Sequence, residues 1–229
     1  MSLPEETTVR IIKDEKTVRG YLEKHSFQDI FSFDISPYTT VVFFDAGDEI
    51  CRQDERPEYL YYIFDGTIKL FFTQRNGKTY IIDFLKAPCF IGEAELLVEN
   101  TYTRGVTALA KCGSFKIDIK KCGQMLLEDP VFLRYICRYQ VEKSTRFTQN
   151  YGHNKAYPLK VRFAEFILMN SRNDIYREQH TEVAEFLGVS YRHLLYVLSD
   201  FVDRGILEKA EEGYRIKNRR ELEKLAQKD

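Results

Sequence analysis

The sequence predicts an α+β fold with an N-terminal β jelly roll, one long connecting helix and a C-terminal winged helix-turn-helix. Short β-branched and aromatic runs alternate with turn residues between Tyr38 and Ile119, which is typical of an antiparallel roll or sandwich. Residues 124–149 contain no glycine and carry apolar side chains at helical spacing. The C-terminal third is again helical and ends in a short hairpin pattern, GILEKAEEGYRIKN, which completes the outline of a winged helix.

Composition and length indicate a globular protein with two domains that can each bury a core. The chain has 229 residues, of which 30% are charged and 44% hydrophobic, and its formal net charge is −1. No apolar run approaches the ~20 residues of a membrane span, and MSLPEETTVR lacks the apolar centre of a signal peptide. We therefore expect a cytoplasmic protein that meets no membrane. Because the chain is nearly neutral, any contact with nucleic acid must use a local basic patch.

The first predicted domain, residues 1–123, combines a helical segment with the roll. Residues 14–31 form a weaker helical pattern that we expect to pack on the sheet. The roll follows as runs of high β propensity: TTVVFF, YLYYIF, TIKLFF and TYIIDFL. Asp65-Gly66 and Asn76-Gly77 are the strongest hairpin markers, because tight hairpin turns need the positive φ that Asn, Asp and Gly adopt readily.

The second predicted segment, residues 124–151, is a helix long enough to connect domains or to form a dimer seam. About 20 helical residues starting near Pro130 would extend ~30 Å. As a coiled-coil seam it is imperfect, because the heptad begun by Leu133 and Ile136 then meets Gln140 and Lys143. The alternative is a helix that packs on its own roll. The apolar or aromatic residues at this spacing are Phe132, Leu133, Ile136, Tyr139 and Phe147.

The third predicted domain, residues 152–229, follows a hinge marked by the breakers Gly152, Asn154 and Pro158. Its segment HTEVAEFLGVSYRHLLYVLSDF fits the helix-turn-helix register: Ala184 is the small residue of the first helix, and Gly188 lies four residues later in the turn. The inward positions carry apolar side chains, which are Val183, Leu187, Val189, Leu194 and Val197.

The second helix of this pair opens at Ser190, a good N-cap, and has a polar and aromatic face opposite its core face. Helical periodicity places on this outer face Tyr191, Arg192, Leu195, Tyr196 and Ser199, with His193 at its edge. Such a face fits the major groove of double-stranded DNA, where Arg192 can pair with a guanine edge and a tyrosine can touch a thymine methyl. The alternative is a helical hairpin in a core, with Tyr191 and Tyr196 as packing residues.

The run RIKNRR lies just after the helix pair. A basic run by itself is usually a solvated face, but beside a helix-turn-helix it favours contact with DNA phosphates. The predicted phosphate clamp consists of Arg215, Lys217, Arg219 and Arg220.

The reactive side chains predict neither an enzyme nor a metal site. The five cysteines are odd in number and show no C-x-x-C spacing, so we expect reduced, mostly buried thiols; the alternative is a redox pair such as Cys112 and Cys122. A jelly-roll metalloenzyme needs two or three histidines and a carboxylate inside the barrel. None of the four histidines falls in the predicted roll: they are His25, His153, His180 and His193. No set typical of nucleophilic catalysis is visible.

The order of a roll, a long helix and a winged helix resembles the CRP/FNR family of bacterial transcription regulators, over nearly the whole chain. Within the roll, FDAGDEI, FDGTIKLF and FIGEAELL match the family pattern, and DFLKAPCFIGE, HTEVAEFLGVSYRHLLYVL and GYRIKNR look closest to its YeiL branch. The resemblance implies a homodimer across the long helix, two recognition helices on a palindromic operator, and RNA polymerase as a further partner. Members that read TGTGA-type sites carry other residues at Tyr191, Arg192 and Tyr196, so we expect a different operator. The N-terminal cysteines of the cluster-type regulators are absent, since the first cysteine is Cys51.

The resemblance also implies an effector site in the roll. In the nucleotide-binding members, Gly-Glu is followed after about ten residues by Arg and a hydroxyl or other small residue, which together hold a ribose and a cyclic phosphate. Gly92, Glu93 and Arg104 match this cassette, and Gly105 replaces the hydroxyl residue. Ser144 and Thr145 on the long helix are candidate base-contacting hydroxyls, and cyclic AMP or a related cyclic nucleotide is the candidate effector.

Three alternatives to the nucleotide-responsive regulator stay open. Glu93 and Arg104 could form a structural ion pair in a pocket that is empty or differently occupied. The chain could be an effector-binding or interaction module whose winged domain meets protein instead of DNA. A thiol-sensing regulator is the third.

Overall fold

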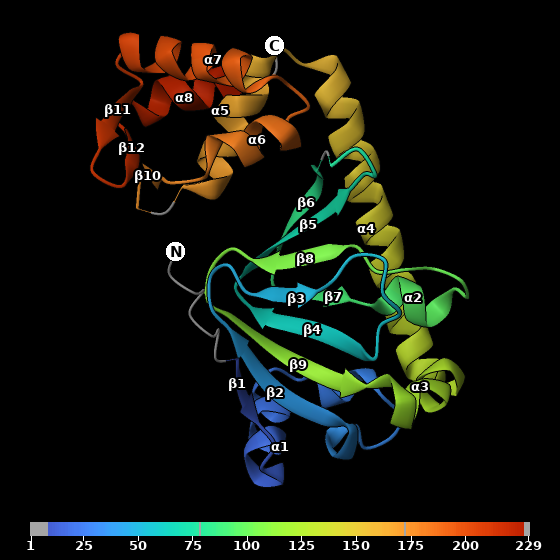
Figure 1. The fold of residues 1–229 in the computed structure, drawn as a ribbon. Helices are drawn as coiled ribbons and strands as arrows, with labels where there is room; N and C mark the ends of the chain where they lie inside the picture. The colour runs from blue at the N-terminus through green and yellow to red at the C-terminus, as the bar shows by residue number, and fades with distance from the viewer. Residues whose placement is uncertain (1–8, 78, 172, 227–229) are drawn as a thin grey trace, which may run out of the picture. The chain divides into compact units, whose positions relative to one another are not determined.

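In the described part of the N-terminal region, nine strands form two antiparallel sheets that enclose a shared core. The computed structural model describes residues 9–77, 79–171 and 173–226, with the backbone alone for 149–155. One sheet has the order β1-β2-β9-β4-β7 and the other β3-β8-β5-β6 (Figure 1). The strands are β1 Arg10–Ile12, β2 Thr39–Phe44, β3 Glu49–Cys51, β4 Tyr59–Asp65, β5 Thr67–Thr73, β6 Thr79–Lys86, β7 Cys89–Ile91, β8 Gly105–Ala108 and β9 Cys112–Asp118. The predicted roll is confirmed.

The two predicted hairpin markers have different outcomes. Asn76-Gly77 connects β5 and β6, which pair antiparallel, and Gly77 has a φ of +79°, so this hairpin is confirmed. The prediction at Asp65-Gly66 is wrong, because β4 and β5 belong to different sheets and the chain crosses between them there. Gly66 is still needed: its φ is +104°, and a Cβ at this position would lie 2.5 Å from Sγ of Cys112.

Short helices cover the roll: α1 Glu15–Lys24, the 3-10 turns η1 Gln28–Ile30 and η2 Ser36–Tyr38, α2 Glu93–Leu97 and α3 Ile119–Glu128. The expected N-terminal helix begins where Asp14 accepts a hydrogen bond from the Thr17 backbone N–H at 2.9 Å. It packs beside β2 (Figure 1). Beneath it, Phe27 stacks on Phe115 with ring centroids 4.7 Å apart, and both rings are buried in the aromatic core.

The long helix α4 is Pro130–Ala156, whereas the predicted segment is 124–151. Residues 124–128 belong to α3 instead, and α4 continues past residue 151. Its start is fixed by Asp129, whose carboxylate accepts from the Val131 and Ser32 backbone N–H groups at 2.9 and 2.8 Å. Phe132 and Ile136 are fully buried in the roll core, which confirms that this face packs on its own roll. The predicted hinge at Gly152 and Asn154 is wrong, because the backbone stays helical there and the helix ends just before Pro158.

The C-terminal region forms a three-stranded sheet, in the order β10-β12-β11, and helices α5, α6, α7 and α8 pack with it in the residues that the structure describes. Its core includes Phe163 and Phe201, whose stacked rings are 5.8 Å apart. The elements are α5 Leu159–Asn170, β10 Ile175–Tyr176, α6 His180–Phe186, α7 Tyr191–Asp203, β11 Leu207–Ala210, β12 Gly213–Ile216 and α8 Arg219–Ala226. The predicted winged helix is confirmed, and α8 is an addition that the sequence analysis did not anticipate.

The chain divides into two compact units, Met1–Glu142 and Lys143–Asp229, and the division falls inside α4. The three-part division predicted at residues 123 and 151 stays a prediction.

Candidate nucleic-acid interface and effector cassette

The turn between α6 and α7 has the geometry that the motif predicts. Gly188 has a φ of +65°, and the Val189 N–H donates to the carbonyl of Ala184 at 2.9 Å, which closes the end of α6. A Cβ at Gly188 would meet nothing within 4 Å. Glycine is therefore required here for its backbone conformation and not for close packing of the two helices.

Helix α7 buries one face and exposes the predicted one. Ser190 accepts a hydrogen bond from the His193 backbone N–H at 3.2 Å, so the expected N-cap is present. The buried face consists of Leu194, Val197, Leu198 and Phe201. The opposite face is open: Tyr191 is 48% and Tyr196 70% exposed. Arg192, His193 and Ser199 are also exposed, and Leu195 is half-buried. Large aromatic side chains with this exposure are not core residues, which contradicts the core-hairpin alternative.

Arg162 supports this turn from α5 and was missed in the sequence analysis. Its Nη1 donates to the carbonyl of Leu187 at 2.5 Å, and its Nε donates to the carbonyl of Tyr157 at 3.0 Å. Burial lowers the pKa of its guanidinium, which nevertheless stays charged. The contact joins residues 25 positions apart, so no local pattern in the sequence could reveal it.

The four residues of the predicted phosphate clamp lie on β12, α8 and the residues between, and two of them have acidic partners. Arg219 donates to Asp174 from Nε at 3.1 Å and forms an ion pair with it from Nη2 at 3.0 Å. Lys217 Nζ lies 3.5 Å from Glu208. Arg215 and Arg220 are exposed and form no ion pair among the described residues. These two cations are available to a phosphate without breaking an existing contact.

In the roll, the first half of the cassette is built as the resemblance implies. Gly92 has a φ of +92° and lies just before α2, whose first residue is Glu93. Glu93 is only 2% exposed, and its Oε1 accepts from Gln140 of α4 at 3.4 Å. Gln140 is a second residue that the sequence analysis did not assign to the site.

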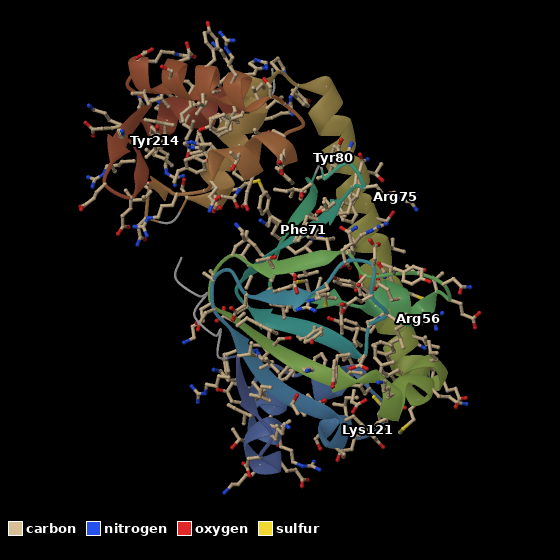
Figure 2. The ribbon with its side chains drawn as sticks, viewed as in Figure 1. Arg56, Phe71, Arg75, Tyr80, Lys121 and Tyr214 are labelled. Carbon is tan, nitrogen blue, oxygen red and sulfur yellow. The ribbon has the colours of Figure 1, made fainter. Side chains whose placement is uncertain are left out.

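The second half of the cassette, Arg104 and Gly105, differs from what the resemblance implies. The guanidinium carbon of Arg104 lies 5.8 Å from the ring centroid of Phe72, and Phe72 stacks on Tyr80 at 5.3 Å. Arg104 is exposed and forms no ion pair with Glu93 in the described part of the chain, so the predicted structural pair of these two residues is wrong. Gly105 is buried beside Phe71, its partner in the β5–β8 pairing (Phe71 and Tyr80 are labelled in Figure 2).

The candidate hydroxyls on α4 lie in the other compact unit. Ser144 and Thr145 are exposed, and the Ser144 carbonyl accepts from the Thr148 hydroxyl at 3.0 Å. Their role toward a ligand of the roll stays a prediction.

The cysteines are free thiols, as expected, and Cys89, Cys112 and Cys122 are buried. Burial raises the pKa of the Cys122 thiol to about 12, and it also raises the pKa of Cys112. The pKa of Cys51 is raised to about 12 by burial and then by the nearby carboxylates, of which Glu95 contributes most. Protonated thiols are poor nucleophiles, so these environments disfavour the redox-pair alternative. No cluster of His, Cys, Asp and Glu suited to a metal ion occurs among the described residues.

Comparisons with known proteins agree with this geometry. A cyclic nucleotide-binding domain model matches residues 41–129, and a Crp-like helix-turn-helix domain model matches residues 161–225. The chain therefore belongs to the CRP/FNR family of transcription regulators. It is 41% identical to the regulatory protein YeiL of Escherichia coli O157:H7 over 90% of this chain and 94% of that protein. It is 26% identical to the cAMP-activated global transcriptional regulator CRP of the same organism, over 52% of this chain and 57% of that protein.

Solved structures share the fold. A CRP/FNR-family regulator from Eubacterium rectale aligns with a TM-score of 0.73 at 14% identity, over 84% of this chain and 91% of that chain. FixK2 from Bradyrhizobium japonicum aligns with a TM-score of 0.65 at 16% identity, over 83% and 98%. Over the described residues, none of the helices combines the length and apolar character that crossing a membrane requires.

Proposed function

We propose that this regulator acts in the cytoplasm as a homodimer that reads a palindromic operator with its paired α7 helices. The observation that carries the proposal is the outer face of α7, where Arg192 lies between two exposed tyrosines on a helix whose other face is fully packed. An arginine in the major groove forms two hydrogen bonds with the O6 and N7 atoms of guanine, and tyrosine rings can contact thymine methyl groups. Arg215 and Arg220 would position the domain on the phosphates without reading sequence.

The exposed side of α4 supports a second copy of the chain as the partner. Arg134, Cys137 and Val141 follow at steps of three and four residues on the side opposite the buried Phe132 and Ile136, and Val141 is 66% exposed. Two copies would double the number of phosphate contacts, which a nearly neutral chain needs for affinity. RNA polymerase is the further partner of the DNA-bound dimer. The proposal assigns no catalytic step to any residue.

Selection of random duplex DNA with the full-length protein tests this proposal. The expected result is an enriched palindrome, bound with an affinity that falls steeply as salt rises. The competing function, a winged domain that binds protein, predicts no enriched sequence and no salt-dependent binding to any duplex. Sedimentation of the same preparation in the presence of the selected operator should give two chains per duplex. One chain per duplex would contradict the dimer.

A further inference from the structure

We propose that Phe71 and Phe72 are specificity-determining residues of the roll, and that they close its anion-binding corner to cyclic nucleotides. The proposal goes beyond the DNA-reading function proposed above and concerns the effector site that the family resemblance implies for the roll. Three features support it: the contact of Phe71 with Gly105, the position of Arg104, and the carboxylates of α2.

Phe71 covers the position where a hydroxyl would be needed. A Cβ built on Gly105 would lie 2.5 Å from Cε2 and 2.9 Å from Cε1 of the Phe71 ring. Contacts this short are not tolerated, so residue 105 can carry no side chain while the ring stays in place. Gly105 is itself buried. The residue after Arg104 therefore offers neither a hydroxyl nor an open surface to a phosphate.

Phe72 holds Arg104, the arginine of the cassette, over its ring. The Arg104 guanidinium lies over the Phe72 ring, and Phe72 is supported by Tyr80 in a nearly parallel stack with an interplanar angle of 17°. A cation over an aromatic face is held by the ring quadrupole, which is a favourable position for an exposed arginine. An ion pair of Arg104 with a phosphate would have to compete with this contact. The rings of β5 and β6 thus compete with a ligand for the only cation of the cassette.

Acidic side chains make the surroundings unfavourable to an anion. Glu93, the first residue of α2, is only 2% exposed. Glu95, the second acid of α2, contributes with Glu93 to the raised pKa of the Cys51 thiol, so their carboxylates lie close enough to act on one buried group. A cyclic phosphate brought to this corner would meet the added negative charge of Glu95, while Arg104 stays stacked on Phe72. The residues present do not fit a cyclic nucleotide.

Calorimetric titration of the full-length protein with cyclic AMP and with cyclic GMP tests the proposal. The wild type should give only heats of dilution, and Arg104→Leu should be indistinguishable from it. The combined variant Phe71→Val, Phe72→Leu, Gly105→Ser makes room at residue 105 and releases Arg104, so it should give a saturable binding heat with at least one of the two nucleotides. Arg75→Leu, which removes an exposed arginine from the turn between β5 and β6, is the control for Arg104→Leu.

Each outcome decides a part of the proposal. Wild-type binding that Arg104→Leu abolishes, and that Arg75→Leu leaves intact, would overturn it. A combined variant that keeps the wild-type melting temperature and still binds no nucleotide would overturn the assignment to Phe71 and Phe72. Binding of the selected operator by the same preparations separates this test from the proposed function, because a protein that excludes nucleotides still binds DNA.

Discussion

Helix α7 and the cassette between Gly92 and Gly105 were both predicted from short motifs, yet only α7 is built as its motif implies. On α7 the N-cap, the buried face and the exposed face all lie where helical spacing places them. In the cassette, Glu93 is in place, but Arg104 stacks on Phe72 and Gly105 lies beneath Phe71. The two sites differ in how far apart in the sequence their contacting residues lie. A helix face is fixed by residues three and four apart, whereas a ligand corner depends on strands that meet from distant parts of the chain.

The largest expected effects come from the two cores, and they test whether the two regions are separate units. Phe115→Ala in the roll and Phe201→Ala in the winged unit should each lower the free energy of unfolding by about 3–5 kcal/mol, because both rings are fully buried. Thermal unfolding can be followed by calorimetry and denaturant unfolding by fluorescence. In either experiment, each variant should shift mainly the transition of its own unit. Equal shifts of a single common transition would show that the two units unfold together.

The next largest changes in stability are expected at two glycines that have open space around them but different backbone conformations. Gly188→Ala should destabilise the winged unit by roughly 1–2 kcal/mol, because its φ of +65° is strained for a residue with a Cβ. Gly20→Ala, inside helix α1 and also without a neighbour within 4 Å, should instead stabilise the roll by about 0.5–1 kcal/mol. Thermal unfolding of both variants measures this. A stabilising Gly188→Ala would mean that the turn is not left-handed.

These comparisons show what the sequence could predict and what it could not. The hairpin at Asn76-Gly77 joins adjacent strands and was predictable from turn chemistry, whereas Asp65-Gly66 has the same chemistry but crosses between sheets. The hinge expected at Gly152 failed because a single glycine costs a helix only ~1 kcal/mol, which the rest of a long helix can outweigh. The contacts of Phe71 with Gly105 and of Arg162 with Leu187 depend on tertiary packing, which cannot be predicted from the spacing of residues.

Smaller changes in DNA affinity should distinguish the basic residues near α7 that have an acidic partner from those that have none among the described residues. Arg215→Ala should weaken binding to every DNA sequence alike and reduce the salt dependence by about one counterion per half-site. Arg219→Ala should change DNA affinity less, because Arg219 is paired with Asp174, and should cost stability by less than about 1 kcal/mol. Fluorescence anisotropy at several salt concentrations distinguishes them. A larger loss of affinity in Arg219→Ala would reverse the assignment.

The smallest effect is a pH dependence of stability in each unit. Burial lowers the pKa of His180 in the winged unit and of His25 in the roll below the ordinary value of 6.5. The unfolded chain then binds protons more readily than the folded one, so stability should be complete above pH ~6.5 and fall as the pH drops toward the lowered folded pKa. His180→Phe should remove this loss from the winged transition alone, and His25→Phe from the roll alone. An unchanged slope between pH 7 and 5 in both variants would assign the dependence to other groups.

Base-by-base binding by Arg192→Ala tests the central claim, that the outer face of α7 reads DNA sequence, most directly. Affinities of the wild type and the variant would be measured on the selected operator and on every single-base change in one half-site. The expected result is a loss of about 1–3 kcal/mol per half-site and relaxed preference at one G·C pair, with all other positions discriminated as before. An equal loss on every sequence, with unchanged preference at every position, would show that Arg192 contacts phosphate and that α7 does not read the operator through it.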